Sequence, residues 1–128
     1  MADGTGPAQD GTAGIREDPI AGIAREDGSI VVSLAGELDL YNAQAVREAL
    51  LELCAESPER LIIDLANVRF IDSTALGVLI EARTRMTNRR SFMLAAPGLE
   101  TRRALEISGL DHHFTVHDTV GAARAATV

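Results

Sequence analysis

The sequence of 128 residues contains no lysine, because all 12 of its basic residues are arginines. Kinases and P-loop nucleotidases hold phosphate groups with a lysine, and Schiff-base enzymes react through one. A receiver domain that is phosphorylated on aspartate also needs a lysine. The absence of this one residue type therefore argues against all of these classes.

Aromatic residues are also scarce: they make up 3% of the chain, and tryptophan is absent. Proteins that bind single-stranded nucleic acid stack bases on exposed aromatic rings, and nearly all nucleic-acid binders need a basic surface. The formal net charge of this chain is -7. We therefore expect no nucleic-acid partner, and a core built from leucine, isoleucine, valine and alanine.

Cys54 is the single cysteine, which excludes an internal disulfide and a zinc site made of several cysteines. No apolar run reaches the length that a membrane-spanning helix needs, and the N-terminus has neither a basic start nor an apolar signal region. These features predict a cytoplasmic protein that does not contact a membrane.

The chain is long enough for one domain with a hydrophobic core. Residues 1–18 are rich in glycine, alanine, aspartate and threonine, without apolar periodicity, and they predict a disordered tail. The domain then covers residues 19–128.

Short β-type runs alternate with helical patterns along this domain. An Asp-Gly turn between the first two runs predicts a hairpin. Residues 35–42 are predicted to form a turn that leads to a helix capped by Asn42. The predicted strands are 20–24, 30–34, 61–65, 91–96 and 114–117, and the predicted helices are 42–57, 73–88, 99–108 and 119–126.

This order predicts an α/β fold: a mixed β-sheet with parallel core strands and an N-terminal hairpin, with helices packed on the sheet. Gly109 is expected to end the third helix in the left-handed conformation.

The segment 68–80 is the most informative part of the chain. A largely apolar stretch ends there in the polar residues Asp72, Ser73 and Thr74, and an apolar run long enough for a helix follows. Either Asp72 or Ser73 can cap this helix. Gly77 lies near its first turn, where glycine costs about 1 kcal/mol relative to alanine. We infer that another backbone approaches Gly77, either within the fold or from a partner.

Three sets of residues resemble parts of a metal site or a catalytic site. Asp39, Asp64 and Asp72 could supply oxygen ligands to magnesium, but aspartates also fill turns and cap helices, so we expect no metal. The histidines at positions 112, 113 and 117 lack a partner at ligand spacing and are expected on loops or the surface. Ser73 lacks the Gly-x-Ser-x-Gly context of a hydrolase nucleophile. We therefore expect no catalytic residue and no enzyme.

Three segments, 34–39, 61–68 and 70–79, resemble the STAS-domain anti-sigma factor antagonists of bacterial partner-switching systems, and the match extends over Pro97 and 105–114. The Asp-Ser-Thr-Ala-Leu-Gly stretch at 72–77 is its most specific part. Many members have glycine where this chain has Ala75, a difference that leaves the acceptor intact and bears on partner choice.

The resemblance implies a single STAS-like domain whose serine is phosphorylated by a partner that is both an anti-sigma factor and a serine kinase. Ser73 is the implied acceptor. The unphosphorylated protein would bind the kinase, which carries the ATP or ADP, and release a sigma factor; phosphorylation would end binding. The family also leaves room for a phosphatase, and it implies no cofactor. The implied partner contacts are Glu37, Asp39, Asp72, Ser73, Thr74, Ala75 and Gly77.

Two alternatives remain open at this point. One is an enzyme, which would require turnover that Ser73→Ala abolishes, and we rank it last. A STAS domain can also be a scaffold subunit of a signalling or lipid-transport complex that phosphorylation does not switch.

Overall fold

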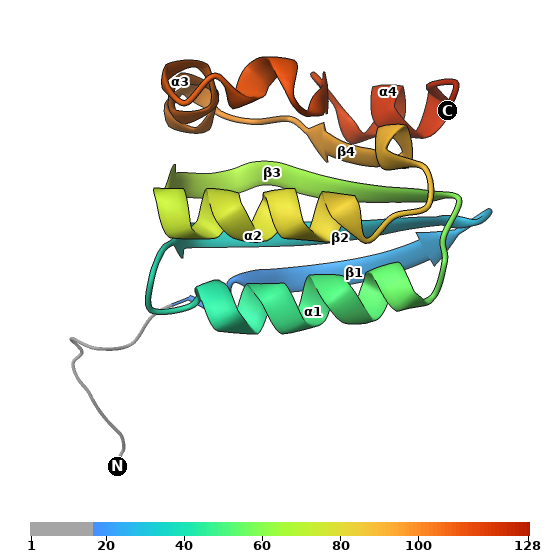
Figure 1. The fold of residues 1–128 in the computed structure, drawn as a ribbon, viewed down its shortest axis with the longest axis horizontal. Helices are drawn as coiled ribbons and strands as arrows, with labels where there is room; N and C mark the ends of the chain where they lie inside the picture. The colour runs from blue at the N-terminus through green and yellow to red at the C-terminus, as the bar shows by residue number, and fades with distance from the viewer. Residues whose placement is uncertain (1–16) are drawn as a thin grey trace, which may run out of the picture.

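The computed structural model describes residues 17–128, in which five strands form one sheet in the order β1-β2-β3-β4-β5. The first pair of strands is antiparallel and the other three pairs are parallel (Figure 1). The strands are β1 Ile20–Glu26, β2 Ser29–Leu38, β3 Arg60–Ile71, β4 Phe92–Ala95 and β5 Thr115–His117. The expected tail lies, up to residue 16, outside the described residues.

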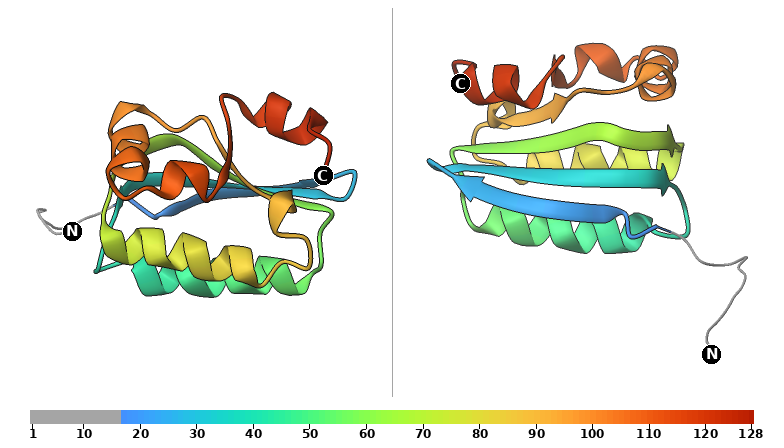
Figure 2. Two further views of the ribbon diagram at one scale, coloured as in Figure 1. Left: turned by 45° about the horizontal axis from the view of Figure 1, so that its top comes forward. Right: turned by 180° about the vertical axis from the view of Figure 1, so that it is seen from behind.

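Helices pack on both faces of this sheet, as the alternation of patterns predicts. Figure 2 shows α1 and α2 side by side on one face, with α4 on the other. The helices are α1 Ala43–Ala55, α2 Ser73–Thr84, α3 Leu99–Ile107 and α4 Val120–Ala125, with short 3-10 helices η1 Arg89–Ser91 and η2 Leu110–His112. The predicted mixed α/β fold with an N-terminal hairpin is confirmed.

The hairpin turn at Asp27 and Gly28 is also confirmed, but β2 is longer than predicted. Residues 35–38 continue the strand, whereas the sequence suggested a turn. Gly36 lies in this continuation with φ +80°, a conformation that glycine adopts without strain, and the pairing with β3 shifts register on both sides of it. A glycine in this strand therefore marks an irregularity and does not end the strand.

Strand β3 is also longer than predicted, because it pairs with the extended β2 from Arg60 to Ile71. It runs to Ile71, and Leu38 and Ile71 are the last pair of the β2–β3 ladder. The two strands consequently end at the same level. The chain segments that follow them, 39–42 and 72–74, begin next to each other.

The prediction that α2 extends to Asn88 is wrong, since the helix ends at Thr84. The Thr84 hydroxyl donates to the carbonyl of Glu81, and the side chain of Asn88 accepts from the backbone N–H of Arg90 to begin η1. Threonine and asparagine compete with helical hydrogen bonds in this way. Met86 nevertheless remains buried, although it lies beyond the end of the helix.

The main core lies between the sheet and the pair α1 and α2, and it is almost entirely aliphatic. Leu34, Leu50, Leu61, Ile63 and Leu65 are all completely buried within it. The other face carries a smaller cluster, in which α4 covers the sheet. This packing holds α1 and α2 in fixed positions, with both helices starting at the edge where β2 and β3 end (Figure 1).

An ion pair ties the two helices together on their outer side. Arg47 on α1 donates two hydrogen bonds to the carboxylate of Glu81 on α2, each 2.8 Å long. These bonds lower the pKa of Glu81 below its ordinary value. The pair therefore joins the first half of α1 to the last turn of α2.

Ala96 follows β4 in the left-handed region, with φ 55°, and it donates its backbone N–H to the carbonyl of His117. An L-residue with a side chain is strained in this conformation, whereas glycine is not. We expect Ala96→Gly to stabilise the protein by about 1 kcal/mol, measured by urea unfolding. The matched control is Ala45→Gly in the exposed face of α1, which should destabilise by about 1 kcal/mol. A loss of stability in Ala96→Gly would contradict the account of strain at this residue.

Candidate functional site

The start of α2 is capped by Asp72 and not by Ser73. The Asp72 Oδ1 atom accepts a hydrogen bond of 2.9 Å from the backbone N–H of Ala75. Ser73 is therefore the first helical residue, it is exposed, and its hydroxyl is not needed for the cap. Of the two caps that the sequence left open, the structure selects the aspartate.

Asp72 also contacts the neighbouring connection between β2 and α1. Its Oδ2 atom accepts a hydrogen bond of 3.0 Å from the backbone N–H of Leu40, and its own N–H donates to the carbonyl of Leu38. One carboxylate thus joins the start of α2 to residues 39–42.

The connection at residues 39–42 is compact. The Asn42 side chain accepts from the backbone N–H of Asp39 and donates to the carbonyl of Glu37, while Asp39 accepts from the N–H of Tyr41. Asn42 occupies the N-cap position of α1, as predicted. Its side chain makes no capping hydrogen bond to the helix, because it bonds to Asp39 and Glu37 in the preceding residues. These bonds give residues 39–42 a defined shape.

Two large apolar side chains protrude from this connection. Leu40 is 67% exposed and Tyr41 is 85% exposed. The sequence interpretation did not single them out, although two adjacent apolar residues between Asp39 and Asn42, in a predicted turn, were a usable signal. Exposed apolar side chains beside a polar rim are typical of a surface that docks onto another protein.

Most of the predicted contact residues lie on this same edge of the domain. Glu37 is exposed near the end of β2, Asp39 is partly exposed, and Thr74 and Gly77 are exposed on the first turns of α2. Ala75 is different: it is 2% exposed, so its methyl group packs in the core. We call the following set the Ser73 surface: Glu37, Asp39, Leu40, Tyr41, Asp72, Ser73, Thr74 and Gly77.

Gly77 does not approach any other backbone in the described residues. A Cβ atom built on it would have no atom within 4 Å outside its own helix backbone and its immediate neighbours. Of the two explanations for this glycine, close packing inside the fold is therefore wrong. Approach by a partner remains.

The three aspartates considered as metal ligands are each engaged locally. Asp64 lies within the extended β3, where it accepts from the N–H of Ala66 and from the Ser33 hydroxyl. Asp39 and Asp72 hold the backbone groups described above. Among residues 17–128, no three acidic, histidine or cysteine side chains come together as a metal site would require. His112 and His113 are exposed, as expected, whereas His117 is the last residue of β5 and is partly buried.

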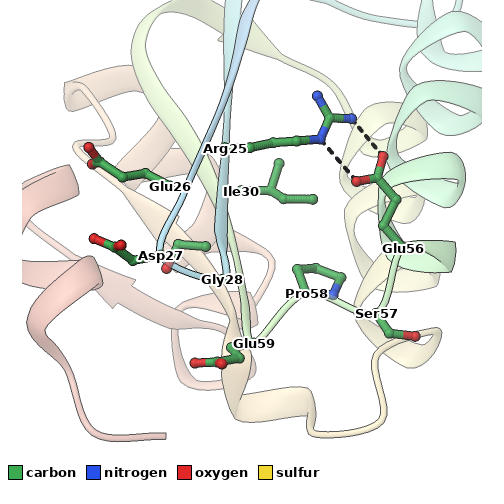
Figure 3. Close-up of a pocket in the computed structure, with 10 residues that line it drawn as sticks. Arg25, Glu26, Asp27, Gly28, Ile30, Glu56, Ser57, Pro58 and Glu59 are labelled. Atoms are coloured by element: carbon green, nitrogen blue, oxygen red, sulfur yellow. Dashed lines mark hydrogen bonds and ion pairs between the residues drawn. The ribbon is translucent and has the colours of Figure 1, made fainter.

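An open hollow of about 440 Å³ lies at the opposite edge of the sheet, between the β1–β2 turn and the connection from α1 to β3 (Figure 3). Arg25 and Glu56 form an ion pair across one side of it. Ser29, which lines this hollow, begins β2, and Leu38 ends that strand beside the Ser73 surface. The two edges are about 30 Å apart at the usual rise per residue. The hollow is thus separate from the Ser73 surface.

The fold and the Ser73 surface together define a class of small α/β module that presents a serine at a helix start beside exposed apolar residues. The family comparison agrees: the STAS domain model matches residues 22–123. The chain belongs to the STAS domain family.

Several relatives of this chain are named anti-sigma factor antagonists. The anti-sigma-F factor antagonist RsfB of Mycobacterium tuberculosis is 34% identical over 110 residues, which cover 83% of this chain and 90% of RsfB. The anti-sigma-B factor antagonist of Bacillus subtilis is 36% identical over 90 residues, or 69% of this chain and 81% of the relative. A crystal structure of an anti-sigma factor antagonist from Mycobacterium paratuberculosis is 34% identical and superimposes with a TM-score of 0.74, covering 80% of this chain and 87% of that one.

None of the helices between residues 17 and 128 has the length and apolar character needed to span a bilayer.

Proposed function

We propose that this protein is an anti-sigma factor antagonist that is switched at Ser73. The unmodified protein binds an anti-sigma factor that is also a serine kinase, and a sigma factor is released. The kinase then transfers the terminal phosphoryl group of its ATP to the Ser73 hydroxyl, leaving ADP, and the phosphorylated protein dissociates. The observation that carries this proposal is the exposed Ser73 hydroxyl at the start of a helix whose cap is supplied by Asp72.

The domain is suited to remain folded when Ser73 is modified. The cap bond from Ala75 to Asp72 does not involve the Ser73 hydroxyl, and an exposed side chain leaves room for a phosphate. The backbone N–H groups and the dipole at the start of α2 also favour a negative charge there. Phosphorylation should therefore alter the surface and leave the fold unchanged.

The same phosphate is unfavourable in a complex. It adds about -1.5 to -2 charges at neutral pH, next to a surface that already carries Glu37, Asp39 and Asp72. A partner that covers Ser73 would have to strip water from the dianion and hold it among these carboxylates. Affinity is lost although the domain stays intact.

The side chains of the Ser73 surface indicate what chemistry its partner should have. Two protruding apolar side chains, Leu40 and Tyr41, call for an apolar pocket, and the three carboxylates around them call for basic residues on its rim. An anti-sigma factor with these properties fits the surface. Because such a partner acts on a sigma factor, this role places the protein in the bacterial cytoplasm.

Gly77 provides a test of how closely the partner approaches. Alanine has open space at this position and a better helix propensity, so Gly77→Ala should stabilise the protein by up to about 1 kcal/mol in urea unfolding. The added methyl group should nevertheless weaken binding of the anti-sigma factor by about tenfold, measured by calorimetry, because it keeps the two surfaces apart. Unchanged affinity in a stabilised variant would contradict a close approach at Gly77.

The test of the proposed function combines displacement with phosphorylation. Each anti-sigma factor with a kinase domain from the same genome is loaded with its sigma factor, and the unmodified protein is added. We expect one of them to exchange the sigma factor for this protein. Incubation of that pair with ATP should then place one phosphate on Ser73, located by mass spectrometry. Thr74→Ala should keep the phosphate and Ser73→Ala should lose it.

Two results would count against the proposal. If no anti-sigma factor releases its sigma factor, the protein is not an antagonist of this kind. If a complex forms but Ser73 takes no phosphate, the protein is a scaffold without the switch, which is one of the alternatives that the sequence left open.

A further inference from the structure

The two halves of the Ser73 surface come from different connections, and a single side chain joins them. The Asp72 Oδ1 atom bonds to the N–H of Ala75 within α2, and the Oδ2 atom bonds to the N–H of Leu40. We propose that Asp72 is a positioning residue that sets where Leu40 and Tyr41 protrude relative to Ser73. This proposal rests on the proposed function, in which both halves contact one partner.

The geometry shows why a side chain is used at this place. The β2–β3 ladder ends with Leu38 and Ile71, and the backbone N–H of Asp72 adds one more bond, to the carbonyl of Leu38. Residues 39–42 lie beyond that bond and are shaped by hydrogen bonds among themselves and with Glu37. The Asp72 carboxylate reaches past the end of the ladder and fixes this compact unit to α2.

The chemistry shows why the residue is an aspartate. The two donors, on Leu40 and Ala75, are both backbone N–H groups, and each needs its own acceptor oxygen. Serine has one oxygen and can cap the helix but cannot also bond to Leu40. Asparagine has one acceptor, and its amide nitrogen would face the second N–H. Only a carboxylate satisfies both donors while its negative charge also favours the start of the helix.

Three variants separate the cap from the link. Asp72→Ser should keep the cap bond from the Ala75 N–H and remove the bond from the Leu40 N–H. Asp72→Asn should keep one of these two bonds, and Asp72→Ala should remove both. The matched control is Thr119→Ala, which removes the cap bond from the N–H of Ala122 at the start of α4 and leaves the Ser73 surface unchanged. The readout is hydrogen exchange of individual backbone N–H groups in the protein alone, followed by NMR.

In Asp72→Ser we expect exchange at the Leu40 N–H to accelerate about tenfold or more, the factor that corresponds to a hydrogen bond to a charged acceptor. The Ala75 N–H should keep its protection. Asp72→Ala should accelerate both positions, and Thr119→Ala neither. Equal exchange at Leu40 in Asp72→Ser and the unaltered protein would overturn the proposal.

A second readout is the affinity for the anti-sigma factor found by displacement, measured by calorimetry. Asp72→Ser should weaken it about tenfold, because Leu40 and Tyr41 no longer have a fixed position. Unchanged affinity together with faster exchange at Leu40 would also overturn the positioning role. If no anti-sigma factor binds at all, the proposed function fails, and the exchange measurement still decides separately whether Asp72 holds the connection.

Discussion

Replacing Ser73 with aspartate is expected to weaken binding to the anti-sigma factor at least about thirtyfold, because an unpaired charge at a docking surface costs 2 kcal/mol or more. Ser73→Ala should bind with nearly the affinity of the unmodified protein. Ser73 is exposed and its hydroxyl is not the cap of α2, so its removal alone leaves the fold and the surface intact. Calorimetry with the purified partner measures both variants.

Charge and size can be separated at this position with Ser73→Asn, which matches aspartate in size and carries no charge. We expect its affinity to lie much closer to that of Ser73→Ala than to that of Ser73→Asp. All three variants should unfold within about 0.5 kcal/mol of the unmodified protein, as is usual for substitutions at exposed sites. Equal affinities of the alanine and aspartate variants would rule out a switch by charge at Ser73.

The second large effect is expected from Leu40→Ala combined with Tyr41→Ala. Side chains that protrude and become buried at the centre of an interface can each cost about 2 kcal/mol when truncated, so the pair should weaken binding by about a thousandfold if the two losses add. Leu40 is 67% exposed and Tyr41 is 85% exposed, so the variant should lose little stability. Calorimetry and urea unfolding measure the two quantities.

Ile23→Ala is the matched control for this double variant. Ile23 is another exposed aliphatic residue, 44% exposed, and it lies on β1 opposite Val32, six residues before the end of β2 at Leu38. We expect it to leave the affinity unchanged. If the double variant bound as tightly as the unmodified protein, the exposed pair would not be part of the docking surface.

Much of the fold could be predicted from local patterns. The hairpin follows from an Asp-Gly turn between two β-type runs, and the parallel core from apolar runs that alternate with helical stripes. Gly109 adopts the left-handed conformation that its place after α3 predicts. The start of α2 was also visible, because three small polar residues separate an apolar strand from an apolar helix.

The ends of the elements were harder to predict, because they depend on what lies alongside. Residues 35–38 look like a turn in isolation, yet they pair with β3 and remain in the sheet. The end of α2 at Thr84 depends on hydrogen bonds made by side chains that also occur inside helices. Such bonds compete with each other, and a local pattern does not show which of them the packed structure selects.

The sequence by itself singled out Ser73 as the acceptor candidate, because the Asp-Ser-Thr-Ala-Leu-Gly stretch at 72–77 is the most specific part of the family resemblance that implies this role. The tertiary structure alone decided that Asp72 is the cap and that Leu40 and Tyr41 stand exposed beside it. The physical reason is that these properties depend on Leu40 and Asp72, which are 32 residues apart in the chain and meet only because β2 and β3 end as neighbours.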